Sequence, residues 1–333
     1  MRSKFVRLLL VVVAFGRLLP CASLFGQVPS PSTWSRHQRA NPSSNQTDPT
    51  TFSQENCNVD HFQLLCATPY NGRSRPIDSS CGHCGQSSLT GEKLTAEFAQ
   101  NFQKDNLCSS SDTPVAVTTD DFNKLQKAVD SIANFKYGNP HAGGFGPPLD
   151  RKPLQFLRDV NGKHLEEGLV VRYLGFMVEE HYSPSSSSDS GESVNCNHTD
   201  QPSVDIHIAL GDKQERVPKK ASVPDKERIL CPTITAEMIP HYRPDDWEFA
   251  QLELISDRQV RVTGQLFFDG SHRACGDPHR ASSDPKRISS WEIHPVYEFE
   301  VCKQSAGCDP EKDSDWQSIT EALKDARAEE NEE

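Results

Sequence analysis

The sequence has few positive charges and no long apolar segment after its first 26 residues. Lys and Arg together number 35 against 47 Asp and Glu, which gives a formal net charge of −12 at pH 7. Binding to nucleic acid through phosphate neutralisation needs clustered Lys and Arg, and attachment to an anionic membrane needs a basic amphipathic helix. Neither pattern is present, which argues against nucleic acid as a partner. The sequence also predicts no membrane span, because a spanning helix needs about 20 apolar residues.

Several catalytic signatures are missing as well. The chain has neither the Gly-x-Ser-x-Gly motif of serine hydrolases nor the His-Glu-x-x-His motif of zinc proteases. Cys81-Gly82-His83-Cys84 matches the redox motif of disulfide isomerases, but no strand pattern precedes it and Ser80 replaces the aromatic residue usual before it. A four-cysteine zinc site would need a second close pair. We therefore expect structural disulfides.

Residues 1–26 have the features of a secretory signal. Basic side chains precede a short apolar run, Leu8–Phe15, and the small residues Ala22 and Ser23 offer a cleavage site. Cys21 leaves lipidation open as an alternative. The sequence thus predicts an extracytoplasmic protein, either periplasmic or secreted.

The cysteine count agrees with that compartment. Of the 11 cysteines, the ten that follow Cys21 form an even set, as expected of disulfides in an exported protein. Five lie in the N-terminal part and five in the C-terminal part, so either one bridge links the two parts or each part keeps one free thiol. The pairs that we predict are Cys81–Cys108, Cys196–Cys231 and Cys275–Cys302.

The chain divides by composition into five segments. With 35% hydrophobic residues in 333, it can form a packed core in one or two domains. The segments are a signal peptide (1–26), a disordered linker (27–55), a cysteine-containing helical region (56–160), a β-barrel-like domain (161–308), and a C-terminal helix with an acidic tail (309–333).

Three helices are predicted from apolar stripes. The first stripe is Leu94, Phe98 and Phe102; the second is Phe122, Leu125, Val129 and Ile132, with Thr118 and Thr119 as N-cap candidates; the third is Trp316, Ile319 and Leu323. For the third helix, Ser314 and Gln317 fit a capping box.

Five strands are predicted in the C-terminal part, at 169–178, 205–210, 234–239, 259–268 and 291–301. Gly175 and Gly264 suggest bends in the two long ones. Five strands joined by unequal loops favour an α+β fold in which a five-stranded Greek-key barrel, similar to the OB-fold, follows a disulfide-stabilised helical region. A β-sandwich and an open α+β sheet stay as alternatives.

Ionisable residues gather on or beside these strands. They are Asp205, His207, His241, Arg243, Asp269, His272, Glu292 and His294. Because strand side chains alternate with period two, Asp205 and His207 share one face, as do Glu292 and His294. Such carboxylate and imidazole groups suit a divalent metal or general acid–base catalysis, with His207 and His294 as the central pair and Asp269 orienting one imidazole. Alternatively they pair across strands and only fix the register.

Two segments carry a resemblance. Gly264–His272 and Trp291–Val296 resemble a pattern in uncharacterised exported bacterial proteins, and Gly191–Cys196 and Asp205–Leu210 fit it too. The resemblance covers about residues 165–303. It implies an extracytoplasmic, OB-like domain and brings no established activity.

Three functions remain open. The first is a secreted or periplasmic binding module whose polar Asp/His/Glu/Arg surface binds a small molecule or an envelope component. The second is a metal-dependent hydrolase, similar to a phosphodiesterase, that uses the same residues. The third is a structural envelope protein without a small-molecule site. A divalent metal is the one cofactor that the sequence suggests.

Overall fold

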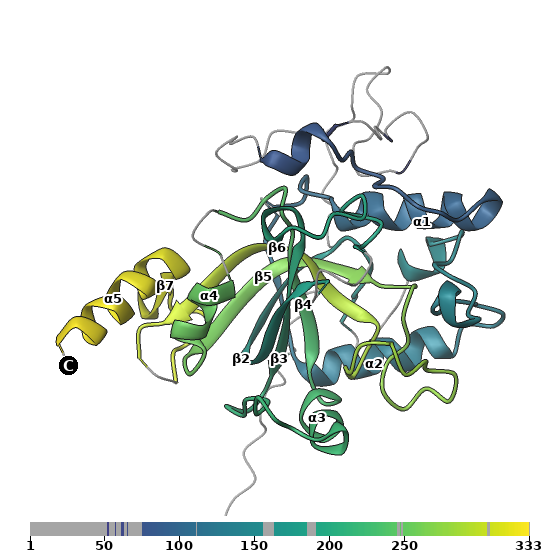
Figure 1. Ribbon diagram of the computed structural model, residues 1–333. Coiled ribbons are helices and arrows are strands. Elements are labelled where there is room, and N and C mark those ends of the chain that lie inside the picture. The colour runs from purple at the N-terminus through teal and green to yellow at the C-terminus, as the bar shows by residue number, and fades with distance from the viewer. Residues whose placement is uncertain are drawn as a thin grey trace, which may run out of the picture. The chain divides into compact units, whose positions relative to one another are not determined.

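All five predicted strands are present, and together with two short ones they form one sheet in a mixed α+β fold (Figure 1). The structure is a computed structural model that describes Phe52, Cys57, His61, Phe62, Leu65 and residues 75–332, except 111, 156–162, 185–190, 245–246, 248 and 305–306. The predicted signal peptide, and the predicted linker apart from Phe52, lie outside the described residues.

The sheet contains β1 (Val115–Val117), β2 (Val170–Ser183), β3 (Asp205–Gly211), β4 (Ile234–Met238), β5 (Gln259–Phe268), β6 (Trp291–Cys302) and β7 (Trp316–Ser318). Its strand order is β1-β2-β3-β4-β6-β5, with β7 paired to β6 and β2 also paired to β5. The β1–β2 and β4–β6 pairs are parallel, and the other pairs are antiparallel.

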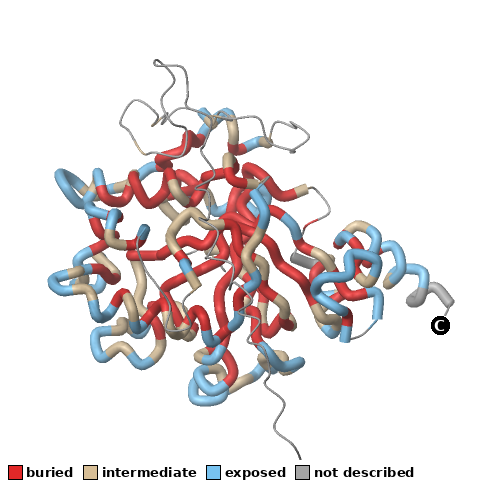
Figure 2. Tube along the Cα trace, turned by 180° about the vertical axis from the view of Figure 1, so that it is seen from behind, coloured by how far each residue is buried: buried red, intermediate tan, exposed pale blue. Residues whose placement is uncertain are grey.

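One face of the sheet carries the hydrophobic core. Because side chains alternate along a strand, Ile206, Ile208 and Leu210 of β3 and Ile234, Ala236 and Met238 of β4 all point into it. In Figure 2 the strands form the buried centre of the molecule. Burying this many apolar side chains supplies the main favourable free energy of folding.

The two predicted N-terminal helices are α1 (Gly91–Lys104) and α2 (Thr119–Asp130). Thr118 caps α2 as predicted, since its side chain accepts a hydrogen bond from the Asp121 amide while Asp121 bonds back to the Thr118 amide. Phe122, Leu125 and Val129 of α2 belong to the same core as the strands. All the described residues lie in one compact unit, Thr47–Glu333, so the segment boundary predicted at 160/161 does not separate two cores.

Two shorter helices and a C-terminal one complete the fold. They are α3 (Val223–Leu230), α4 (Phe249–Leu252) and α5 (Ile319–Glu332). No helix among the described residues is long and apolar enough to cross a membrane.

The predicted start of the C-terminal helix is wrong. Residues 316–318 form β7 against β6, because Trp316 packs on the Cys302–Cys308 disulfide as part of a buried cluster. The helix begins only at Ile319, and the capping pair is Ser318 with Glu321 rather than Ser314 with Gln317.

Gly264 lies at a bulge between β5 and β6, where the register shifts. A Cβ atom on Gly264 would lie 2.4 Å from the Pro295 carbonyl oxygen and 2.5 Å from Ile293 Cγ2, so a side chain there requires the strands to separate. The bulge also accommodates Pro295, which has no amide hydrogen for the ladder.

The predicted disulfide pairings are wrong, although all six cysteines named in them are disulfide-bonded. The pairs in which both cysteines are described are Cys57–Cys84, Cys81–Cys196, Cys231–Cys275 and Cys302–Cys308. Loop position along the chain does not predict the partners, because the loop after β2 reaches the N-terminal part, where Cys196 bonds to Cys81. Cys81–Cys196 links the two parts, which is the first of the two alternatives that the cysteine count left open. Cys81 and Cys84 bond to different partners and not to each other, so they do not form the disulfide of a redox motif. Several disulfides in one chain are typical of a protein in an oxidising compartment.

Replacing Phe122 with Ala tests whether α2 and the sheet share one core. Phe122 is fully buried, and a cavity of this size costs about 3–5 kcal/mol of unfolding free energy. We expect urea unfolding, followed by circular dichroism and by tryptophan fluorescence, to shift to lower urea as one coincident transition. The exposed change Lys127→Ala in the same helix should leave it within about 0.5 kcal/mol. Two separate transitions would contradict a shared core.

Candidate functional site

The face of the sheet opposite the hydrophobic core is polar and buried. β3 carries Asp205 and His207, and β6 carries Glu292 and His294, each pair on this face as the alternation predicts. Between them, β4 carries Glu237, which lies directly across from His207 in the register. β4 and β6 run parallel with Thr235 opposite Glu292, so Glu237 lies beside His294. Strand pairing alone therefore brings these five side chains together.

Helix α1 and the loop after β2 cover this face. The last turn of α1 contributes Lys104, and the loop contributes Glu192, whose neighbour Ser193 bonds to the Gln86 amide and the Asn101 side chain. The Cys81–Cys196 disulfide ties the same loop to the segment before α1. Glu192 is thus held over the sheet by segments far apart in sequence.

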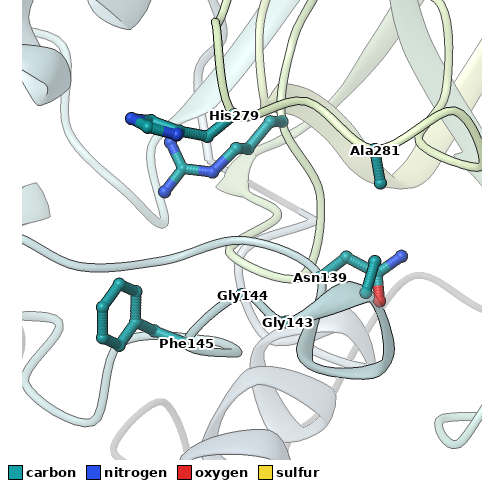
Figure 3. A pocket seen from close by; sticks show the side chains of 8 residues that line it. Asn139, Gly143, Gly144, Phe145, His279 and Ala281 are labelled. Carbon is teal, nitrogen blue, oxygen red and sulfur yellow. The ribbon is translucent and has the colours of Figure 1, made fainter.

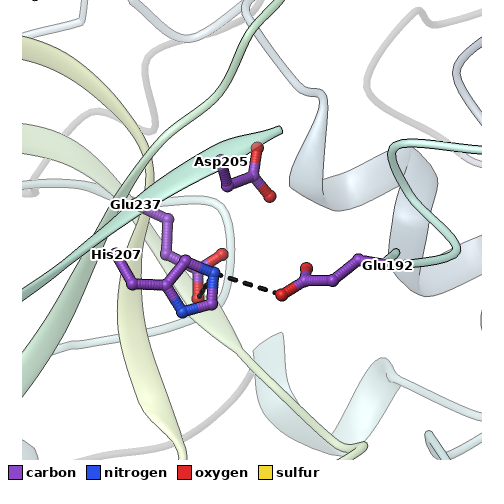
Figure 4. Close-up of side chains that lie close together, drawn as sticks. All are labelled: Glu192, Asp205, His207 and Glu237. Carbon is purple, nitrogen blue, oxygen red and sulfur yellow. Dashed lines mark ion pairs between the residues drawn. The ribbon is translucent and has the colours of Figure 1, made fainter. Parts of the chain in front are cut away.

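Four residues form what we call the carboxylate–histidine cluster: Glu192, Asp205, His207 and Glu237 (Figure 4). Each offers a ligand atom, and these atoms all lie within 4.8 Å of one another. His207 Nε2 lies 3.2 Å from Glu192 Oε1 and 3.5 Å from Glu237 Oε1. Lys104 Nζ lies 3.7 Å from Glu192 Oε2 and 3.6 Å from Glu237 Oε2.

Asp205 differs from the other carboxylates because nothing stabilises its charge directly. It is fully buried, and neither carboxylate oxygen has a hydrogen-bond partner among the described residues. Burial, followed by the charges of Glu192 and Glu237, raises the pKa of Asp205 to about 7. A buried carboxylate without a partner costs free energy.

The pKa values of the two glutamates beside Asp205 are shifted downward, because these carboxylates have cationic partners. Burial would raise the pKa of Glu192, but Lys104 and His207 outweigh it and lower the pKa to about 2. Glu237 likewise has a pKa well below its usual value, where His207 and Lys104 overcome burial. Burial would lower the pKa of His207, but Glu237 and Glu192 raise it to about 9.

Glu237 also belongs to a second group, with Glu292 and His294. His294 Nδ1 lies 2.7 Å from Glu237 Oε2 and 3.6 Å from Glu292 Oε2. Burial, only partly offset by Glu237, lowers the pKa of His294. Arg287 forms a buried ion pair with Glu292 and reaches Asp269 Oδ2 at 2.7 Å, so it links this group to the end of β5.

A cavity of about 500 Å³ lies beside the carboxylate–histidine cluster. It is bounded by α1, by the loop at 191–197 and by residues 269–283, and Lys104, Glu192, Asp269 and His272 line it. Glu192 and Lys104 contact both the cavity and the cluster, so a ligand in the cavity would lie next to the cluster.

The structure brings together six of the eight residues predicted from the sequence: Asp205, His207, Asp269, His272, Glu292 and His294. His207 and His294 do not pair directly, since Glu237 lies between them. Asp269 orients neither of these two; it contacts His272 instead, which corrects the expected arrangement.

The other two predicted residues lie elsewhere. His241 Nδ1 lies 2.7 Å from Asp78 Oδ1, and its ring stacks on Phe62. Arg243 is buried and donates to the backbone carbonyls of Val204 and Gln201. Both therefore support the fold, and neither belongs to the carboxylate–histidine cluster.

Four site residues were missed: Lys104, Glu192, Glu237 and Arg287. The alternation in β4 could have indicated Glu237, because Ile234, Ala236 and Met238 fill the core and leave residue 237 on the polar face. Lys104, Glu192 and Arg287 come from a helix end and two loops, where no periodicity places a side chain.

A second cavity, of about 280 Å³, lies between the 139–145 loop and residues Arg273, His279 and Ala281 (Figure 3). Arg273, which has the one guanidinium group among the residues that line this cavity, already donates to Asp277 Oδ2 at 2.5 Å and to the Tyr137 carbonyl oxygen at 2.7 Å. The charged group of this cavity therefore already has hydrogen-bond partners, whereas Asp205 of the carboxylate–histidine cluster has none among the described residues.

Comparisons of this chain with protein-family models, with curated proteins and with solved structures return no match.

Two neutral substitutions separate the roles of the carboxylates in stability. In metal-free protein at pH 8, Asp205→Asn should raise the unfolding free energy by about 1–3 kcal/mol, because it removes a buried charge that has no partner. Glu237→Gln should lower it by about 3–5 kcal/mol, because it removes the carboxylate nearest to His294 and leaves His207 and Lys104 with Glu192 alone. Chemical denaturation at constant ionic strength measures both. If Asp205→Asn destabilised the protein as much as Glu237→Gln, Asp205 would have a stabilising partner.

Proposed function

We propose that this chain is an extracytoplasmic binding module that binds a divalent cation at Glu192, Asp205, His207 and Glu237 and a small polar ligand in the adjoining cavity. The observation that carries the proposal is Asp205, a fully buried carboxylate with no hydrogen-bond partner among the described residues, beside two more carboxylates and an imidazole. A bound cation would supply the missing partner.

The spacing of the ligand atoms supports a cation. Metal bonds of about 2.0–2.2 Å to carboxylate and imidazole place the ligand atoms no more than about 4.4 Å apart. The four atoms lie within 4.8 Å of one another, so only small side-chain movements are needed. Carboxylate oxygens suit Mg²⁺, Ca²⁺ and Mn²⁺, whereas imidazole suits Zn²⁺ and other transition metals. The mixed set favours Mn²⁺ or Zn²⁺.

Charge balance supports a divalent ion. The three carboxylates of the cluster are opposed by Lys104 and, without a metal, by protonated His207, which leaves one negative charge. Burial, together with the neighbouring charges of Glu192 and Glu237, raises the pKa of Asp205 to about 7. A divalent cation bound to neutral His207 would, with Lys104, neutralise all three carboxylates. Lys104 is then a permanent counter-charge beside the metal.

The proposal includes the fold that carries the site. We infer that β2, β3, β4, β6 and β5 make a five-stranded, OB-like Greek-key barrel, preceded by the disulfide-stabilised helical region at 56–160 that covers its polar face. The pairings β2–β3, β3–β4, β4–β6, β6–β5 and β5–β2 support this, because each strand pairs with two others of the set. Export is supported by the disulfides.

Metal titration tests the proposal. After dialysis against chelator, wild-type protein should bind one equivalent of Mn²⁺ or Zn²⁺ at this cluster by isothermal titration calorimetry, and the metal should raise its melting temperature. Asp205→Asn and Glu192→Gln should each weaken binding at least tenfold, because each removes a charged ligand.

The control is Glu215→Gln, which removes an exposed carboxylate that pairs with Arg228. It should bind metal as the wild type does. Wild-type protein that binds neither metal, or Asp205→Asn that binds as tightly as wild type, would refute the proposed function.

A further inference from the structure

His272 and Asp269 form a dyad at the wall of the cavity. His272 Nδ1 lies 2.7 Å from Asp269 Oδ2. Asp269 is almost completely buried, whereas the side chain of His272 is 36% exposed. His272 Nε2 has no hydrogen-bond partner among the described residues, and both residues line the cavity. The free ring nitrogen is therefore available to a ligand.

Asp269 is held in one orientation by several donors. Arg287 Nη2 lies 2.7 Å from Oδ2, while the Ser271 amide donates to Oδ1 at 2.9 Å. Gln100 Nε2 lies 3.4 Å from Oδ1, and it also donates to the Ser271 hydroxyl at 2.7 Å. A carboxylate fixed in this way selects the imidazole tautomer with the proton on Nδ1, which leaves Nε2 as an acceptor.

The dyad and the carboxylate–histidine cluster open onto the same cavity. His272 and Asp269 lie on one side of it, and Glu192 and Lys104 also line it. Hydroxyl and amide side chains such as Asn101 and Ser271 also line it, and the remaining lining residues include Glu97, His141, Pro140 and Val194. Among the described lining residues no phenyl, phenol or indole ring is present. This lining suits a polar, charged group rather than an apolar one.

From this juxtaposition we propose that the protein hydrolyses phosphate esters in the cavity, with His272 as a catalytic general base and Asp269 as its positioning residue. The proposal rests on the proposed cation site. A carboxylate-rich cation site acts as a Lewis acid toward phosphoryl oxygen, and the Lys104 ammonium adds positive charge beside it. Phosphate esters are therefore favoured over carboxyl esters.

The step balances without a further reactant. His272 Nε2 takes a proton from a water molecule, and the water oxygen forms a bond to phosphorus. The bond from phosphorus to the leaving oxygen breaks on the opposite side, that oxygen takes a proton from solvent, and His272 releases its proton to solvent. A non-bridging phosphoryl oxygen would lie on the cation. The products are a phosphate with one fewer ester bond and an alcohol.

The experiment compares three chromogenic esters with metal-loaded protein: bis(4-nitrophenyl) phosphate, 4-nitrophenyl phosphate and 4-nitrophenyl acetate. We expect hydrolysis of a phosphate ester in preference to the acetate, and the first two substrates distinguish diester from monoester. His272→Ala should lower kcat by about 10²- to 10⁴-fold, leave metal stoichiometry at one, and regain activity with added imidazole.

The matched control is His164→Ala. His164 also pairs with a carboxylate, with Nε2 lying 3.0 Å from Glu166 Oε2, but it is exposed and does not line the cavity. Its substitution should leave kcat unchanged. His272→Gln serves as a second variant if His272→Ala does not fold, and Asp269 keeps Arg287 as its partner in both.

The role of Asp269 has a separate readout. ¹⁵N NMR of wild-type protein should show neutral His272 with its proton on Nδ1, and Asp269→Asn should change the tautomer. A His272 proton on Nε2 in the wild type would overturn the assignment of Nε2 as the base.

The outcomes separate the two proposals. Metal-loaded protein that hydrolyses neither phosphate ester, or a folded His272 variant with kcat within threefold of wild type, overturns the hydrolase and leaves the cation site standing. Protein that binds no metal overturns both.

Discussion

The Glu237 carboxylate is the centre of the polar face. It lies 2.7 Å from the His294 ring, 3.5 Å from the His207 ring and 3.6 Å from the Lys104 ammonium, at a depth where an isolated charge would be very costly. Three cationic or imidazole partners from three different elements therefore depend on one carboxylate. Through Glu237, side chains of β3, β6 and α1 are therefore connected across the polar face.

The sheet separates apolar and charged side chains between its two faces. Ile206, Ile208 and their neighbours fill the core on one face, so the fold does not depend on the polar face for its hydrophobic stabilisation. The polar face can therefore carry Asp205, a buried carboxylate without a hydrogen-bond partner, at a cost in free energy that the core offsets. Sites of this kind, stable in spite of a locally unfavourable group, are where function is expected.

The features that were predicted correctly from the sequence are those that follow from the periodicity of strands and helices. All five central strands, and the shared faces of Asp205 with His207 and of Glu292 with His294, follow from alternation along the chain. Helix α2 followed from its apolar stripe and the Thr118 cap. By contrast, loop folding over the sheet decides which cysteines pair and where the side chains of Glu192 and Arg287 lie. Local sequence contains no signal for the path of a loop. Ser314 failed as a cap because Trp316 gained more by packing on a disulfide in a strand than by starting the helix.

The central claim is that a divalent cation occupies the space between Glu192, Asp205, His207 and Glu237. The most direct measurement is the anomalous diffraction of crystals of this protein grown with Mn²⁺. The account predicts a single strong peak bonded at about 2.0–2.2 Å to an Asp205 oxygen and to at least two of the other three ligand atoms, with Lys104 Nζ outside the coordination sphere. The absence of an anomalous peak there would contradict a bound cation, as would an electron-density map in which Lys104 Nζ or a hydrogen-bonded water molecule contacts Asp205 instead.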